Sequence, residues 1–172
     1  CIAALLASAH AGAATRTAAS CSRTDVLASI AVASPGDTVF VPAGTCSWSG
    51  GISISGIQLV GAGSSTNGTV ITAGLVSMTK YSSQYTRLSG FRFTGTDPHI
   101  AAGGSASAKP YIIDNNYVRS DVAGIALQLR ANGGLVHHNE VVAVNVTGSD
   151  NFNIPTGEDW SQPPTFGADD TT

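Results

Sequence analysis

The side chains that could do chemistry gather around one short β segment near residue 128. Apolar and polar residues alternate there, so that Leu127 and Leu129 point inward while Gln128 and Arg130 point outward. Lys80 occupies a comparable place in an earlier segment of the same kind. We predict that Lys80, Gln128 and Arg130 share an outer face that could bind a carbohydrate.

Aspartates come just before these β segments. Asp97, Asp121 and Asp150 would stack as a loose column of carboxylates if the segments stack on one another. Ca²⁺ takes oxygen ligands of this kind, so the column predicts a calcium site. Solvated turn aspartates and surface bases would explain the same residues, and the sequence leaves both interpretations open.

Two histidines and two asparagines form a second polar group. His137 and His138, followed by Asn139 and Glu140, are residue types found in metal sites and acid–base pairs. Neighbours in a strand point to opposite faces, so both imidazoles cannot reach one ion without distortion. We therefore expect one exposed histidine and one near a turn. Asn116 and Asn139 occupy equivalent positions, and we predict that they form an Asn ladder in a turn.

The cysteines and the first residues indicate export. Residues 1–11 are a short apolar run ending in Ala-His-Ala, typical of part of a signal peptide, and we expect residues 12–20 to be a short linker. The remaining pair, Cys21 and Cys46, is separated by 25 positions, and closing such a loop is worth about 3 kcal/mol. We predict a Cys21–Cys46 disulfide. An apolar N-terminal helix and two buried free thiols are the alternatives.

The composition excludes several functional classes. The 172 residues include 8 Lys and Arg against 11 Asp and Glu, with a formal net charge of -3 and no basic cluster, so nucleic acid is not an expected partner. The apolar run is too short to cross a membrane. The hydrophobic fraction of 42% can build one core, and 20 glycines among β-branched residues favour short strands joined by tight bends.

A helix and a strand follow Cys21. Ser22 and Asp25 have the spacing of a capping box, and Val26 and Ile30 recur at helical spacing before a Pro-Gly pair. A β-rich run over 37–44 then closes on a Pro/Gly turn. Residues 24–45, which include GDTVFVPAGT, resemble the N-terminal cap of the pectate-lyase-like β-helix superfamily. In that superfamily a helix, here expected over 25–33, covers the end of the solenoid.

Short β segments recur along the chain, with residues 52–54, 57–63 and 70–71 as the first coil. One series is anchored at intervals of 25 residues by Leu75, Ile100 and Ile125. A second is anchored at intervals of 25 and 23 by Leu88, Ile113 and Val136. Two series that rise together predict a three-sided, all-β solenoid. With the resemblance, this predicts a right-handed single-stranded parallel β-helix with a short N-terminal capping helix, occupying residues 21–172 and continuing beyond them.

The resemblance implies a secreted, extracellular or cell-surface protein, or a periplasmic one, that acts on a polysaccharide. In the lyases of the superfamily, Ca²⁺ bridges a uronate carboxylate of an acidic polymer and an Arg or Lys abstracts the C5 proton. Arg130 would then be the candidate catalytic base, and Ca²⁺ would be the one cofactor. A lyase or a glycoside hydrolase is the enzymatic interpretation, with the fragment itself inactive. A non-catalytic, adhesin-like carbohydrate-binding β-helix is the alternative, and a monomer is expected.

Overall fold

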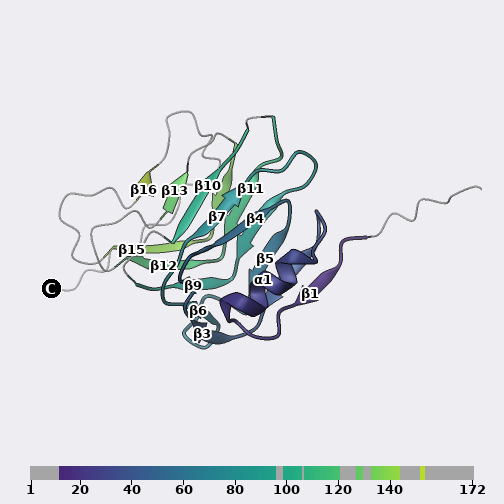
Figure 1. Cartoon of the computed structure of the whole chain (residues 1–172). Coiled ribbons are helices and arrows are strands. Elements are labelled where there is room, and N and C mark those ends of the chain that lie inside the picture. Colours follow the sequence, from purple (N-terminus) through teal and green to yellow (C-terminus); the bar gives the residue numbers. More distant parts are fainter. Residues whose placement is uncertain are drawn as a thin grey trace, which may run out of the picture.

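Parallel strands wind around one axis in the computed structural model of the chain, which describes residues 12–95, 99–105, 107–120, 127–129, 133–143 and 152–153 (Figure 1). Successive turns of the chain add one strand to each of three sheets, and the described strand pairs are all parallel. The fold is an all-β parallel β-helix of about five coils, which confirms the predicted solenoid.

The three sheets are named here by their strands. The six-stranded sheet contains β1 Thr15–Thr17, β2 Thr38–Val41, β5 Gln58–Gly61, β8 Thr86–Ser89, β11 Tyr111–Asp114 and β14 Leu135–His137. The β4 sheet contains β4 Ile52–Ser55, β7 Val76–Thr79, β10 Ile100–Gly103, β13 Leu127–Leu129 and β16 Phe152–Asn153. The β3 sheet contains β3 Gly44–Cys46, β6 Thr69–Ile71, β9 Phe91–Phe93, β12 Tyr117–Ser120 and β15 Glu140–Ala143.

Alternation along each strand decides which side chains enter the core. In the six-stranded sheet, the strand register stacks one inward column of apolar residues, namely Val39, Leu59, Leu88, Ile113 and Val136. Fully burying an aliphatic side chain of this size is worth about 1.5–3 kcal/mol, so the column is a main source of stability. The predicted equivalence of Leu88, Ile113 and Val136 is confirmed.

The predicted alignment of the other series is wrong by one residue at Leu75 and by two at Ile125. Val76 pairs with Ile100, and Ile100 pairs with Leu127, so the intervals are 24 and 27 residues rather than a constant 25. The inward position therefore belongs to Val76, whereas Leu75 is only partly buried. A constant interval fails because the loops between strands differ in length from coil to coil. Ile125 lies outside the described residues.

The helix α1, Arg23–Ala31, lies at the N-terminal end of the stack, against β2 and β4 (Figure 1). Ser22 is its N-cap, and the Ser22 hydroxyl accepts a hydrogen bond from the Asp25 N–H at 3.2 Å. The Asp25 carboxylate accepts from the hydroxyl of Ser20, which in turn accepts from the Ser22 N–H. Val26 is fully buried and Ile30 packs against the core, so this face of the helix covers the end of the solenoid.

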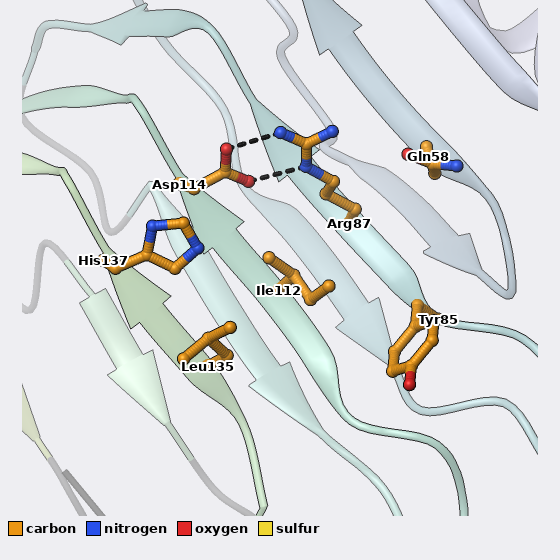
Figure 2. A pocket seen from close by; sticks show the side chains of 7 residues that line it. All are labelled: Gln58, Tyr85, Arg87, Ile112, Asp114, Leu135 and His137. Carbon is orange, nitrogen blue, oxygen red and sulfur yellow. Dashed lines mark hydrogen bonds and ion pairs between the residues drawn. The ribbon is translucent and has the colours of Figure 1, made fainter. Parts of the chain in front are cut away.

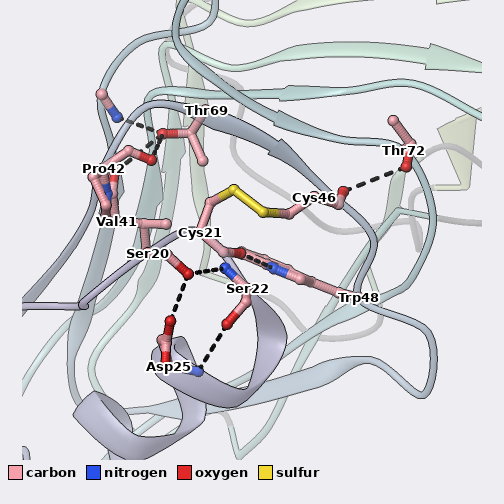
Figure 3. Close-up of a disulfide and its surroundings, with 11 residues drawn as sticks. Ser20, Cys21, Ser22, Asp25, Val41, Pro42, Cys46, Trp48, Thr69 and Thr72 are labelled. Carbon is pink, nitrogen blue, oxygen red and sulfur yellow. Dashed lines mark hydrogen bonds between the residues drawn. A yellow bond between two sulfur atoms is a disulfide. The ribbon is translucent and has the colours of Figure 1, made fainter.

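A disulfide ties this cap to the first coil. Cys21 and Cys46 are bonded, with Cα atoms 5.9 Å apart (Figure 3). The indole N–H of buried Trp48 donates to the Cys21 carbonyl oxygen at 2.8 Å. Cys21, two residues before the helix, is thereby joined to Cys46 at the end of β3 and to Trp48 in the loop that follows.

Residues 12–20, expected to be a linker, contain a strand. β1 pairs in parallel with β2, Thr15 opposite Thr38. The carboxylate of Asp37 accepts hydrogen bonds from the Ala14 N–H at 2.8 Å, the Ser34 N–H at 2.9 Å and the Arg16 guanidinium at 3.0 Å. These bonds, those from the backbone first, hold the pKa of Asp37 below its ordinary value. Asp37 therefore fastens the first strand to the cap.

Two buried asparagines occupy the turn that follows β11 and β14. The Asn116 side-chain oxygen accepts from the Phe91 N–H at 3.0 Å, and its amide donates to the Leu88 carbonyl at 3.1 Å. Asn139 repeats this pattern one coil later, accepting from the Asn116 N–H at 3.0 Å and donating to the Ile113 carbonyl at 2.7 Å. Each asparagine thus satisfies buried backbone groups of the preceding coil.

Candidate functional site

A groove lies on the outer face of the six-stranded sheet. The strand register places Gln58, Arg87, Ile112 and Leu135 in one outward column. The groove has a volume of about 250 Å³ and is lined by Gln58, Tyr85, Arg87, Ile112, Asp114, Leu135 and His137 (Figure 2). The column residues each come directly before an inward core residue, so the packing of the β-helix fixes their outward direction.

Arg87 and Asp114, which both line this groove, form a bidentate ion pair. Arg87 Nε lies 2.7 Å from Asp114 Oδ1, and Nη2 lies 2.6 Å from Oδ2. Ser89 and Asn115 also donate to Oδ2. Burial alone would raise the pKa of Asp114, but the hydrogen bonds and charge of Arg87 outweigh burial and hold that pKa below its ordinary value. Asp114 is therefore a fixed anion near neutral pH.

The cation of this pair faces solvent while the anion does not. The Arg87 side chain is 34% exposed, against 1% for Asp114. The third guanidinium nitrogen, Nη1, is turned away from Asp114 (Figure 2). Among the described residues, none accepts a hydrogen bond from it. Arg87 therefore presents a fixed, positively charged donor to a ligand in the groove.

An aromatic ring and a second cation stand at one end of the groove. Tyr85 is 48% exposed, which is unusual for a large aromatic residue. The ammonium of exposed Lys109 lies 5.7 Å from the centre of the Tyr85 ring. Ile112 and the exposed Leu135 supply apolar surface on the two strands that follow β8 in the sheet (Figure 2). The groove therefore combines a flat ring, an apolar floor and cationic donors.

The two histidines meet at the end of β14, which corrects the expectation that they point to opposite faces. The strand ends at His137, and His138 has a φ of 53°, in the left-handed region. The turn brings the two Nδ1 atoms to 2.7 Å, with the rings 4.9 Å apart and at 86°. Strand alternation applies only while both residues are extended, and His138 is not.

Two of the residues predicted to bind a carbohydrate, Gln128 and Lys80, lie outside the groove. Gln128, on β13, is in register with Ala101 and belongs to the β4 sheet, a different face from the groove. Lys80 follows β7 and is only 6% exposed, with its ammonium 5.6 Å from the centre of the Tyr111 ring. Arg130, Asp97, Asp121 and Asp150 lie outside the described residues and stay predictions.

The β4 sheet carries a shallower hollow with less chemistry. Its volume is about 400 Å³, and its lining is glycine, serine and aliphatic: Gly50, Gly51, Ile52, Ser53, Gly74, Leu75 and Ser77. Within the part of the chain that the structure describes, no group of three or more His, Cys, Asp or Glu side chains is placed to hold a metal ion. In the same part, no helix is long and apolar enough to cross a membrane.

Sequence reasoning missed the groove, although a signal for it was present. The anchors Leu88 and Ile113 were identified correctly, and the residue before each of them must face outward. Reading those positions would have placed Arg87 next to Ile112. The exposed Tyr85, two residues before Arg87, lies on the same side of the sheet.

Comparison of the chain with protein-family models, with curated proteins and with solved structures finds no match. The function must therefore be argued from the groove itself and from the resemblance of the cap.

Proposed function

We propose that the protein is a secreted, polysaccharide-active β-helix of the pectate-lyase-like kind, and that its glycan lies in the groove of the six-stranded sheet. The proposal is carried by one combination: exposed Tyr85 beside Arg87, whose guanidinium is fixed by buried Asp114. Sugar rings have apolar faces and hydroxyl edges. Sites for them need aromatic surface and a few oriented polar groups, and both are present.

The exposed charge of the groove favours an acidic glycan. Asp114 is almost fully buried, whereas Arg87 is partly exposed and Lys109 is exposed. The Asp114 carboxylate therefore binds Arg87 on the buried side, and the Arg87 guanidinium and the Lys109 ammonium both remain accessible to solvent. Salt screens attraction between exposed charges over a Debye length of about 8 Å at physiological ionic strength, so binding of an acidic polymer should weaken at high salt.

The activity itself is the finer part of the proposal. The resemblance of the cap supports a polysaccharide lyase or a glycoside hydrolase, with Arg130 as candidate base and Asp97, Asp121 and Asp150 as calcium ligands. In the sequence Arg130 follows β13 of the β4 sheet, so this catalysis would act on a part of the polymer outside the groove. The groove supports binding more directly than catalysis, because its one carboxylate, Asp114, is held ionised by Arg87, whereas glycoside hydrolysis usually needs two carboxyl groups. A non-catalytic carbohydrate-binding surface protein is therefore the second candidate.

Export and a monomeric state belong to the same proposal. The Cys21–Cys46 disulfide supports an oxidising compartment, because such bonds rarely persist in the cytosol. Size-exclusion chromatography with light scattering would test the monomer.

The deciding experiment measures binding of the chain to polygalacturonate and to a neutral polysaccharide, using matched substitutions on two faces. We expect Tyr85→Ala to weaken binding about tenfold, because it removes the stacking surface. Gln58→Ala, in the groove, should weaken it about threefold, and Gln128→Ala, on the β4 sheet, should leave it unchanged. Loss only in Gln128→Ala would move the binding face to the β4 sheet. Absence of binding to any polysaccharide would refute the proposal.

The activity is tested separately with the same polymers. A lyase should release unsaturated products from polygalacturonate, and calcium chelation should reduce that release. New reducing ends without unsaturated product would indicate a hydrolase. Glycan binding without either product would favour the non-catalytic alternative.

A further inference from the structure

We propose that His137 and His138 form a chelating site for one divalent transition-metal ion, with Cu²⁺ preferred. The argument for this site does not use the proposed glycan function, although His137 also lines the groove. It starts from the Nδ1 atoms of the two imidazoles, which lie 2.7 Å apart at the protein surface. Imidazole nitrogen suits copper, nickel and zinc, whereas Ca²⁺ and Mg²⁺ take oxygen ligands.

The separation of the two nitrogens allows both of them to bind one ion. With metal–nitrogen bonds of about 2.05 Å, two nitrogens lie about 2.9 Å apart at a right angle and about 3.3 Å apart at the tetrahedral angle. The observed 2.7 Å is a hydrogen-bonded distance, and a small rotation of the two accessible side chains opens it to the separation that a bound ion needs. Square-planar nitrogen sites favour Cu²⁺ or Ni²⁺ over Zn²⁺, and Cu²⁺ binds more tightly than Ni²⁺ in the Irving–Williams order.

The backbone of the turn places the two rings next to each other. His138 takes the left-handed position of its turn, where the preceding coils have Asn115, with a φ of 55°, and Gly90, with a φ of 76°. Asn139, the next residue, donates to the His137 carbonyl at 3.0 Å and to the preceding coil. The ladder thus fixes the turn that carries both ligands, so little ordering is needed when an ion binds.

The site is open to solvent, and one of its rings changes tautomer when an ion binds. His138 is exposed and His137 is partly exposed, so an ion with coordinated water can approach. In the hydrogen bond between the two Nδ1 atoms, one nitrogen carries a proton, and that ring must take its Nε2–H tautomer before both Nδ1 atoms can bind the ion. Among the described residues, no further His, Cys, Asp or Glu completes a set of three, so water would fill the remaining positions.

The test is titration of the whole chain with Cu²⁺, followed by calorimetry and electron paramagnetic resonance, with Zn²⁺ and Ca²⁺ as comparison ions. His138→Asn and His138→Gly keep residue types that the other coils use at this turn, so the fold should survive in at least one of them. His137→Gln removes the other ligand. His10→Ala, which removes a histidine elsewhere in the chain, is the matched control.

We expect one Cu²⁺ per chain with two nitrogen ligands, at least tenfold weaker binding in each His137 and His138 variant, and no change in His10→Ala. Zn²⁺ should bind more weakly, and Ca²⁺ should not compete. Wild-type affinity in folded His138→Asn or His138→Gly would overturn the proposal. So would loss of binding in His10→Ala alone, or the absence of Cu²⁺ binding by the wild-type chain at micromolar concentrations.

Discussion

Replacing Arg87 with Met should destabilise the protein by about 3 kcal/mol, because it leaves a buried carboxylate without its cation. Asp114 accepts two hydrogen bonds from Arg87 and one each from Ser89 and Asn115. Removing one partner of a buried ion pair typically costs about 3–5 kcal/mol. The lower end applies here, since Arg87 is partly exposed and two other donors remain.

The double variant Arg87→Met/Asp114→Asn provides the control. It removes the buried charge as well as the cation, so its cost should fall to about 1 kcal/mol, the usual net value of hydrogen bonds between neutral groups. The assay is urea denaturation at pH 7, with the free energy of unfolding extrapolated to water. The single variant Asp114→Asn completes the cycle. Costs of the two single variants that add strictly in the double variant, or a cost of Arg87→Met below about 1 kcal/mol, would refute the reasoning.

A pH series gives a second check on the same residue. In the wild type the pKa of Asp114 is lowered, so its contribution to stability is complete above the unfolded-state value of about 3.9 and is lost as the pH falls through the folded-state pKa. In Arg87→Met, burial dominates and raises the pKa, so protonation relieves the buried charge as the pH falls. The stability gap should therefore narrow between pH 7 and pH 4. A constant gap would contradict this account.

Three further results are expected. Reducing the Cys21–Cys46 disulfide should lower the free energy of unfolding by about 3 kcal/mol, measured by denaturation with and without reductant; equal stability would contradict a role for the bond in the cap. Asn116→Ala should lower the free energy of unfolding by about 3 kcal/mol, because it leaves buried backbone groups of the preceding coil unpaired. Asn115→Ala, at an exposed position, should lower it by about 1 kcal/mol. Equal decreases in urea denaturation would count against the ladder. Asp37→Asn should flatten the decrease in melting temperature below about pH 4, because the lowered pKa of Asp37 makes its stabilisation disappear as the carboxylate is protonated; an unchanged slope would argue against it.

The fold was predictable where the signal is local. Ser22 begins the helix and Val26 is buried because capping and helical spacing involve only neighbouring residues. The anchors Leu88, Ile113 and Val136 were found because their spacings, 25 and 23 residues, are nearly equal. The slip at Leu75 came from loops of unequal length, which a search for a constant period cannot detect.

The site was harder to predict because it depends on contacts between coils. Arg87 is in register with Ile112 but reaches diagonally to Asp114, two residues further along β11. Strand alternation gives the face of a residue but not the direction in which a long side chain extends across it. The contact between His137 and His138 was not predicted for a different reason. The left-handed backbone of His138 is set by the turn, and histidine has only a weak preference for that conformation.

The asparagine ladder also gives the solenoid a polarity. Both Asn116 and Asn139 use their side chains to bind backbone groups of the coil before them. A coil that has already folded therefore acts as the template for the next, and shifting the new coil by one residue would leave buried donors and acceptors of its template unpaired. The alignment of each of these coils is thus tied to that of the coil before it, in the direction of the disulfide-bonded cap.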